Sequence, residues 1–177
     1  MINIKIKEVS EILNAQCIGI CEPDKHIKGV SIDSRNVTEN NLFIPIKGMT
    51  VNGHSFVKDA IKNGAQATLW NMDESNPPND IAVILVEDTV KALQELSRYY
   101  RNRLKTKIVG ITGSNGKTST KDITAAILSQ KYKTQKTMGN YNTEIGVPFT
   151  LLSLDEDCET AVIEMGMERK GEIDFLT

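Results

Sequence analysis

The chain has 177 residues, of which 40% are apolar and 25% are charged, and its formal net charge is −2. This length and composition can support a buried core, arranged as one domain or as two small ones. The balanced charge gives no general electrostatic reason to expect a nucleic acid or an anionic membrane as a partner. No apolar run approaches the roughly 20 residues that cross a bilayer, and Met1 does not begin a signal sequence, so we expect a cytoplasmic protein.

Short strands and helices alternate through the first 80 residues, which predicts a small α/β domain. The helical spacing of Val9, Ile12 and Leu13 predicts a first helix. A second helix is predicted at residues 56–61, whose apolar side chains share one face, and Gly64 is expected to stop it. Strands are predicted at 2–6, 29–32, 42–46 and 65–70. The polar residues 71–80 contain two adjacent prolines and are typical of an exposed connection to a second domain.

From residue 81 the predicted elements are longer. Asp88 or Thr89 caps a helix that runs to about Leu104, and a later helix is expected to turn Ile123, Ala126 and Ile127 inward. The strands are expected at 81–86, 107–112 and 161–164. This order predicts a doubly wound, mostly parallel sheet that is only partly present, so we divide the chain into domains 1–80 and 81–177.

The cysteines are an odd set of three in a chain of middle size, which argues against a disulfide framework. Cys17, Cys21 and His26 lie close together in the sequence, but they lack a fourth ligand and fit no common zinc pattern. We expect all three cysteines to be ordinary buried or surface residues.

A glycine-rich loop between a predicted strand and a predicted helix carries the strongest chemical signal. Gly113 and Gly116 allow backbone N–H groups to surround phosphate oxygens, and Lys117 adds a mobile positive charge for the β and γ phosphates. The Thr118 hydroxyl can ligate the Mg²⁺ that accompanies ATP. Ile111 replaces the first glycine of the general phosphate-loop pattern. The residues expected to contact the nucleotide are Thr112, Gly113, Ser114, Asn115, Gly116, Lys117, Thr118 and Ser119.

Glu164 is the second candidate for the metal, because it ends the apolar strand 161–164. Phosphate-loop enzymes hold or position magnesium with a carboxylate in such a place. The guanine-reading and magnesium-linked motifs of a switch GTPase are missing from the sequence. A small-molecule kinase is also disfavoured, since more than a hundred residues with their own core precede this loop.

The loop from Thr112 to Thr118 matches Thr-Gly-[Ser/Thr]-Asn-Gly-Lys-Thr of the Mur ligases, and essentially the whole chain resembles that family. Residues 139–152 and 164–173 look like the member that adds D-alanyl-D-alanine to UDP-N-acetylmuramoyl-tripeptide. The resemblance implies peptidoglycan precursor synthesis with ATP and Mg²⁺, in which an acyl phosphate forms and an incoming amine attacks it. It implies catalytic roles for Lys117, Asn140, Asn142 and Thr143, although the last three could simply cap turns.

The N-terminal domain resembles the part of the family that holds the uridine nucleotide. The candidate contacts to UDP are Ser31, Asp33, Ser34, Arg35, Lys47, Gly48 and His54. Arg and Lys suit a pyrophosphate, whereas Ser and His can hydrogen-bond uracil. Residues 33–35 could equally form a turn with an internal salt bridge. Asn52 stands where the family usually has Asp, which makes the contact there less certain.

The family's complete enzyme is much longer, so we expect this chain to be an N-terminal fragment, monomeric and inactive alone. One alternative is a MurE-type or other amide ligase, such as folylpolyglutamate or cyanophycin synthetase, because the residues that select the amine lie outside this chain. The other alternative is a non-catalytic nucleotide-binding module.

Overall fold

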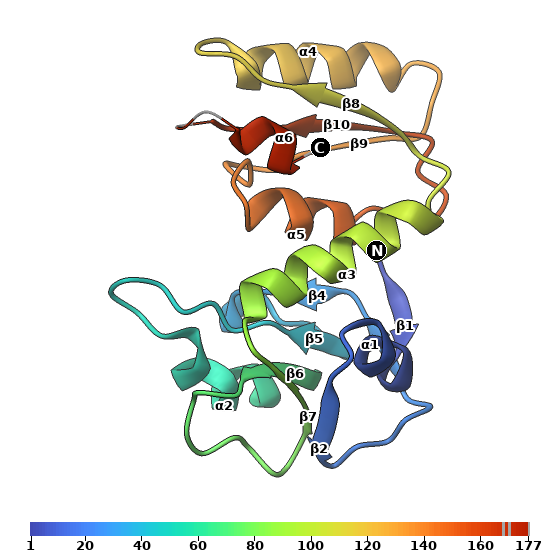
Figure 1. The fold of residues 1–177 in the computed structure, drawn as a ribbon. Coiled ribbons are helices and arrows are strands. Elements are labelled where there is room, and N and C mark those ends of the chain that lie inside the picture. Colours follow the sequence, from blue (N-terminus) through green and yellow to red (C-terminus); the bar gives the residue numbers. More distant parts are fainter. Residues whose placement is uncertain (168, 170, 177) are drawn as a thin grey trace.

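Two main sheets form the frame of the molecule, with helices between and around them (Figure 1). The computed structural model describes residues 1–167, 169 and 171–176. The larger sheet has the strand order β2-β7-β6-β5-β4. In that order its strands are Gln16–Gly19, Ala82–Val86, Ala65–Asn71, Asn41–Phe43 and Val30–Ser31. β4 to β7 run parallel, and β2 is antiparallel to β7.

Helices cover both faces of the larger sheet. α3 (Thr89–Arg103) contributes Leu93 and Leu96 to the core on one face, and α2 (Val57–Lys62) contributes Ala60 to the core on the other. Successive strand residues alternate between these two cores, as the period of two along a strand requires. Asp88 caps α3, because its Oδ1 accepts hydrogen bonds from the N–H groups of the first turn, as the sequence predicted.

The N-terminus adds a two-stranded antiparallel sheet beside this frame, made of β1 (Asn3–Lys5) and β3 (His26–Lys28). α1 (Ile6–Ile12) follows β1 directly. A short turn after β2 joins Cys17 to Cys21 in a disulfide, which differs from our expectation of ordinary cysteines. The left-handed conformation of Gly19, with φ +72°, makes this turn and brings the two cysteines together. Cys158 is free and buried.

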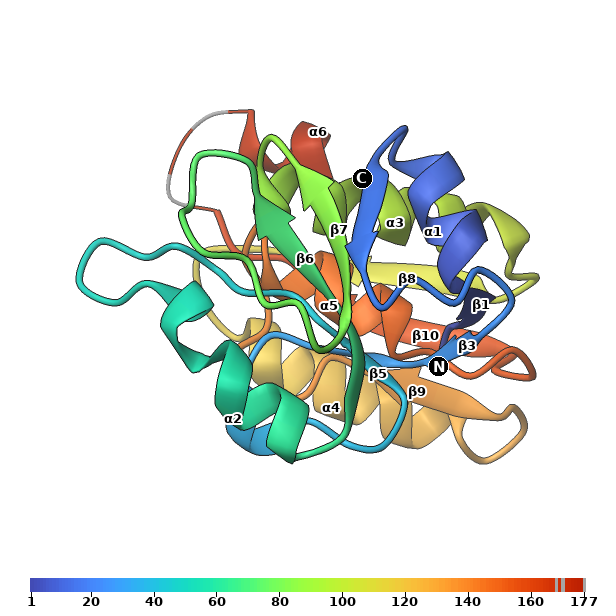
Figure 2. The ribbon, with the colours of Figure 1, turned by 90° about the horizontal axis from the view of Figure 1, so that it is seen from below.

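The smaller sheet has the order β8-β10-β9 and is entirely parallel. These strands are Lys107–Ile111, Thr160–Glu164 and Thr134–Lys136. α4 (Lys117–Leu128) and α5 (Gly146–Leu152) both pack against β10, and Figures 1 and 2 show them on opposite sides of the sheet. α3 and α5 lie between the two main sheets (Figure 1). The mixed α/β class with mostly parallel sheets is as the sequence predicted.

The structure moves the boundary between the two units away from residue 80. β7 pairs with β2 and β6, so the strand 81–86 belongs to the first sheet. The second sheet begins only at β8, after α3. The prediction placed β7 in the second domain because parallel strands of both sheets are buried on two faces, and their apolar runs look alike.

The predicted inward face of α4 is wrong. Ile123 and Ile127 are 61% and 66% exposed, whereas Lys121 and Ala125 are the buried residues of this helix. The helix turns Lys121 and Ala125 toward β10, which places a lysine where the pattern favoured isoleucine. None of the helices in the described part of the chain combines the length and apolar character that a membrane span needs.

Two short 3₁₀ helices follow β4 and β5, and they contain several of the predicted UDP contacts. They are η1 (Ser34–Asn36) and η2 (Gly53–Phe56). A short helix, α6 (Glu172–Leu176), lies near the end of the chain. Because β4 to β7 are parallel, the segments after their carboxyl ends gather at one edge of the larger sheet.

Candidate functional site

The loop between β8 and α4 has the backbone that phosphate binding requires. Gly113 and Gly116 have φ values of +144° and +75°, which side chains with a Cβ rarely adopt. Gly116 is also the N-cap of α4, so the positive end of the helix dipole faces the loop. The Lys117 ammonium group folds over the loop and donates a hydrogen bond to the Gly113 carbonyl at 2.8 Å. The remaining predicted contacts are exposed, namely Thr112, Ser114, Asn115 and Ser119.

The Glu164 carboxylate is buried at the end of β10, beside the first turn of α4. Its Oε1 accepts a hydrogen bond from Asn142 Nδ2 at 2.9 Å. Its Oε2 is buried and has no hydrogen-bond partner among the residues that the structure describes. The Lys121 ammonium group approaches Oε2 to 3.5 Å, and both side chains are only 4% exposed. One carboxylate oxygen is therefore held in place while the other keeps lone pairs for a ligand.

Several groups act on the ionisation of Glu164. Burial raises the pKa of this carboxyl, but the Asn142 hydrogen bond, the nearby Thr118 hydroxyl and the charge of Lys121 together outweigh burial, so its pKa lies below the usual value. The Thr118 hydroxyl thus lies close to the carboxylate, although it does not complete a hydrogen bond to Oε2. Glu164 is an anion near neutral pH.

The groups present fit a magnesium ion. The unpartnered Oε2 of Glu164 and the nearby hydroxyl of Thr118 are hard oxygen donors of the kind that Mg²⁺ prefers. Within the described residues, no group of three or more His, Cys, Asp or Glu side chains could hold a metal ion. A magnesium ion here would need phosphate oxygens and water as its other ligands, which is its usual coordination in nucleotide sites.

A cavity of about 650 Å³ is lined by Asn142, the hydrogen-bond partner of Glu164, although Glu164 and Thr118 are not among the lining residues. Its lining includes Lys117, Asn142, Thr143, Gly166 and Arg169. Lys117 and Asn142 come from different segments, so the fold brings the phosphate loop and the stretch before α5 to one hollow. A cavity of this size can take a nucleotide's phosphates with part of a second substrate.

The three polar residues before α5 have different roles. Asn142 orients Glu164, as described above, and its backbone N–H donates to the Asn140 carbonyl at 2.8 Å. Thr143 Oγ1 accepts a hydrogen bond from the Gly146 N–H at 3.3 Å, so this hydroxyl caps the start of α5. Thr143 also lines the cavity, whereas Asn140 is exposed. The roles of Asn140, Asn142 and Thr143 near the γ-phosphate stay a prediction.

Among the predicted UDP contacts, residues 33–35 form a turn with an internal salt bridge. The Asp33 carboxylate accepts hydrogen bonds from the Arg35 backbone N–H and guanidinium, the shortest at 2.7 Å. These bonds lower the pKa of Asp33. Ser31 is buried and its hydroxyl donates to the Asp33 carbonyl at 2.8 Å, while Ser34 is also buried. The Arg35 side chain remains 86% exposed.

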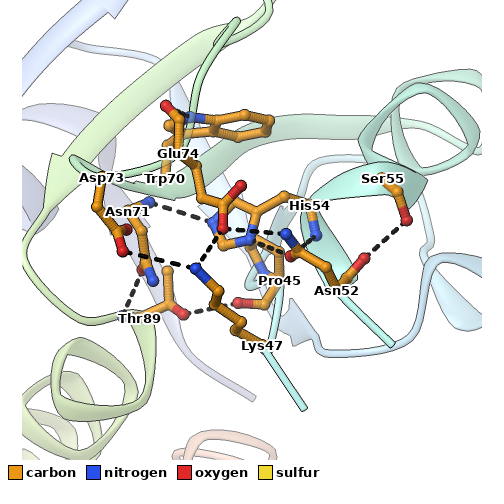
Figure 3. A network of polar contacts seen from close by, with 10 residues as sticks. All are labelled: Pro45, Lys47, Asn52, His54, Ser55, Trp70, Asn71, Asp73, Glu74 and Thr89. Carbon is orange, nitrogen blue, oxygen red and sulfur yellow. Dashed lines mark hydrogen bonds and ion pairs between the residues drawn. The ribbon is translucent and has the colours of Figure 1, made fainter. Parts of the chain in front are cut away.

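His54 is the centre of the polar network drawn in Figure 3. Its Nδ1 lies 2.8 Å from Asn52 Oδ1, and its Nε2 accepts a hydrogen bond from the Asn71 N–H at 3.2 Å. The ring packs edge-on against Trp70 and is 3% exposed. Both ring nitrogens are thus engaged within the protein, so His54 would bind a ligand only by giving up one of these contacts. The sequence around His54, which follows a loop glycine, contains no pattern that indicates this burial.

Lys47 belongs to the same network and is charge-paired within it. Its ammonium group lies 2.7 Å from Glu74 and 3.5 Å from Asp73 (Figure 3). Hydrogen bonding to Glu74 raises the pKa of Lys47. Gly48 follows in a tight turn, with its N–H bonded to the Val51 carbonyl. No sequence pattern marks Glu74, Asn71 or Lys121, because their partners are distant in the sequence.

Comparison with known proteins places both parts of the chain in one family. Residues 26–101 match the description "Mur ligase family, catalytic domain" and residues 111–177 match "Mur ligase middle domain". The UDP-N-acetylmuramoyl-tripeptide--D-alanyl-D-alanine ligase of Bacillus subtilis is 45% identical over 177 residues, which are 100% of this chain and 39% of that protein.

Solved structures agree with these sequence matches. MurF from Acinetobacter baumannii superposes with a TM-score of 0.85 at 32% identity, over 99% of this chain and 38% of the other. The MurF ligase from Thermotoga maritima, solved in complex with ADP, has a TM-score of 0.71 at 36% identity, over 84% of this chain and 34% of the other. The chain spans well under half the length of these relatives.

Proposed function

Because the chain belongs to the Mur ligase family, we propose that it supplies the front part of an ATP-dependent ligase that joins D-alanyl-D-alanine to UDP-N-acetylmuramoyl-tripeptide. The named activity of the Bacillus subtilis relative and the ADP in the Thermotoga maritima structure support this proposal. In this chain the observation that carries it is the unpartnered Oε2 of Glu164 beside the Thr118 hydroxyl, at the start of the phosphate-loop helix.

The phosphate loop is the part that holds ATP in this proposal. Loop N–H groups and the dipole of α4 face the β and γ phosphates, and Lys117 exchanges its bond to the Gly113 carbonyl for a phosphate oxygen. Thr118 and Glu164 would hold magnesium, which neutralises charge on the transferred phosphoryl group when it is bound. Asn142 keeps the Glu164 carboxylate oriented through its bond to Oε1.

The reaction places few chemical demands on these residues. A substrate carboxylate oxygen attacks the γ phosphorus, the bond to the β-phosphate oxygen breaks, and ADP leaves. The amine of the second substrate then attacks the acyl carbon, loses a proton, and expels phosphate to leave the amide. Phosphoryl transfer depends mainly on positioning and charge neutralisation, which the loop, Lys117 and the oriented Glu164 provide.

The uridine end of the substrate is assigned to the edge of the larger sheet. Residues 33–35 and 47–48 follow the neighbouring parallel strands β4 and β5. The loop after β5 lies on the same side of the molecule as the phosphate loop (Figures 1 and 2). Arg35 is the more exposed of the two cations named for this edge and would bind the pyrophosphate, and Lys47 and Gly48 would add contacts from the loop after β5.

Calorimetric titration of the 177-residue chain tests the ATP end. We expect saturable binding of Mg-ATP that weakens about 30-fold in Lys117→Ala, because a charge-assisted phosphate contact is lost. Lys131→Ala removes an equal charge from an exposed lysine after α4 and should bind like the original chain. Equal affinity in the Lys117 and Lys131 variants would contradict the proposed role of the loop.

A separate titration with UDP tests the substrate end. UDP should bind the original chain and bind much more weakly to Arg35→Ala, with Lys28→Ala as the control at an exposed lysine of β3. UDP binding that does not respond to Arg35 would move the pyrophosphate site elsewhere. Binding of ATP without any binding of UDP would favour a nucleotide-binding module over a ligase.

A further inference from the structure

Lys121 is a buried charge in the second turn of α4. It lies on the same helix face as Thr118, and only 3% of the residue is exposed. Lysines are rarely buried to this degree unless they are paired. The Lys121 ammonium group lies 3.5 Å from Glu164 Oε2 and 3.7 Å from the Asp122 carboxylate.

Both of these ion pairs are looser than a direct charge-assisted hydrogen bond, which is about 2.7–2.9 Å long. Asp122 has a closer cation, because Lys136 lies 2.8 Å from it. Oε2 of Glu164 has no hydrogen-bond partner in the described part of the chain. Lys121 therefore balances the charge of Glu164 from a distance and leaves the oxygen open to a closer ligand.

We propose that Lys121 is the resident counter-ion of the magnesium site, holding Glu164 in place without metal and opposing the binding of a divalent cation to Oε2. The inference rests on the proposed function, because it takes Glu164 as the magnesium ligand. Two cations that share one buried carboxylate repel each other, so each weakens the binding of the other.

This arrangement links the metal to the nucleotide. With Lys121 present, Glu164 and Thr118 together offer a divalent ion almost no net negative charge. Phosphate groups in the loop would add the charge that outweighs Lys121, so magnesium should bind with the nucleotide rather than before it. Lys121 is a positioning residue in this account, since it acts on the metal site through Glu164.

Three variants of the 177-residue chain test the proposal: Lys121→Met, Lys121→Arg and Lys131→Met. Binding of Mn²⁺, used as the probe, is measured by electron paramagnetic resonance with saturating ADP. We expect Lys121→Met to bind Mn²⁺ about tenfold more tightly than the original chain. Lys121→Arg keeps the positive charge and Lys131→Met removes a charge elsewhere, so both should stay close to the original affinity.

Thermal unfolding adds a measurement that does not depend on activity. Without metal, Lys121→Met should unfold at a lower temperature, because Glu164 loses its counter-ion. Addition of Mg²⁺ and ADP should then raise its unfolding temperature more than that of the original chain. A purely structural lysine would instead lower the unfolding temperature equally with and without metal, which would overturn the proposal.

Two outcomes separate this proposal from the proposed function. If ADP binds but Mn²⁺ binds no more tightly to Lys121→Met, the counter-ion proposal is wrong and the ligase assignment stands. If the original chain does not bind ADP, both fail. Should Lys121→Met not fold without metal, Lys121→Gln makes the same measurement, because it keeps an N–H donor for Oε2 without the charge, and the expected direction is the same.

Discussion

The carboxyl edges of the two sheets carry similar polar side chains but use them differently. At the edge of β4 to β7, Lys47 pairs with Glu74, and both ring nitrogens of His54 have protein partners. At the edge of β8 and β10, Glu164 Oε2 is buried without a hydrogen bond and Lys117 bonds a loop carbonyl. The edge of β8 and β10 thus keeps one buried carboxylate oxygen open, although Lys117 would have to give up its carbonyl partner, whereas the polar groups at the edge of β4 to β7 are already paired within the protein.

The largest effect on stability is expected from breaking the hydrogen-bond network around His54, at the edge of β4 to β7. His54→Leu leaves the buried Asn71 N–H without its partner and removes the ring contact of Asn52 Oδ1, which keeps only the hydrogen bond from the backbone N–H of residue 54, so the free energy of unfolding should fall by about 3 kcal/mol. Affinity for ADP should not change. Urea unfolding checks this, with His26→Leu as the control at an exposed histidine. Equal losses in the two variants would mean that the network contributes no more than a surface contact.

A smaller loss of stability is expected at the edge of β8 and β10, from a substitution that changes the conformation of the phosphate loop. Gly116→Val forces a β-branched residue into φ +75°, which should cost about 2 kcal/mol of stability and weaken ADP binding. Gly116→Asn should cost less, because Asn tolerates the left-handed region. Paired unfolding and calorimetric measurements test both substitutions. Identical behaviour of Val and Asn would argue that the loop changes conformation freely.

The buried histidine also predicts how stability depends on pH. Burial lowers the pKa of His54 below 6.5, against the opposing charge of Glu74. The unfolded chain therefore binds a proton more readily, and stability should fall as the pH drops below 6.5, by at most about 1.4 kcal/mol per pH unit. Unfolding free energies at pH 7.5 and 5.5 should show this slope in the original chain and a shallower one in His54→Leu. A slope that is the same in both would assign the acid sensitivity to other groups.

The smallest effect is expected from the exposed turn at residues 33–35. Arg35→Ala removes a salt bridge whose guanidinium is 86% exposed, so the free energy of unfolding should change by less than about 0.5 kcal/mol. The same substitution is expected to weaken UDP binding, which separates a ligand contact from a structural one. A loss of several kcal/mol in urea unfolding would instead show that Arg35 has a structural role like that of His54.

Local sequence signals predicted the parts of the fold that depend on neighbouring residues. α3 has a strong apolar stripe and an Asp88 cap, and both are present in the structure. The phosphate loop was predictable because its glycines, lysine and flanking elements are contiguous. Glu164 was a candidate because it ends an apolar strand, and it does lie beside the first turn of α4.

Features that depend on distant partners could not be predicted in this way. α5 is short and contains Pro148, and no helical period marks it. Lys121 is buried because Glu164 lies across from it, more than forty residues later in the chain, and an apolar pattern favours Ile123 for that face instead. A histidine such as His54 can serve equally well as a ligand contact or as the centre of a buried hydrogen-bond network. Its contacts with Asn71 and Trp70 show the second arrangement, and both partners are distant in the sequence.

The most direct test of the central claim is the magnesium dependence of ADP binding to the original chain and to Glu164→Gln, measured by calorimetry with magnesium or with a chelator. The account predicts that magnesium strengthens ADP binding about tenfold in the original chain and has little effect in the variant, which loses the anionic Oε2. Equal strengthening in both proteins would contradict the assignment of Glu164 as the magnesium ligand of the phosphate loop.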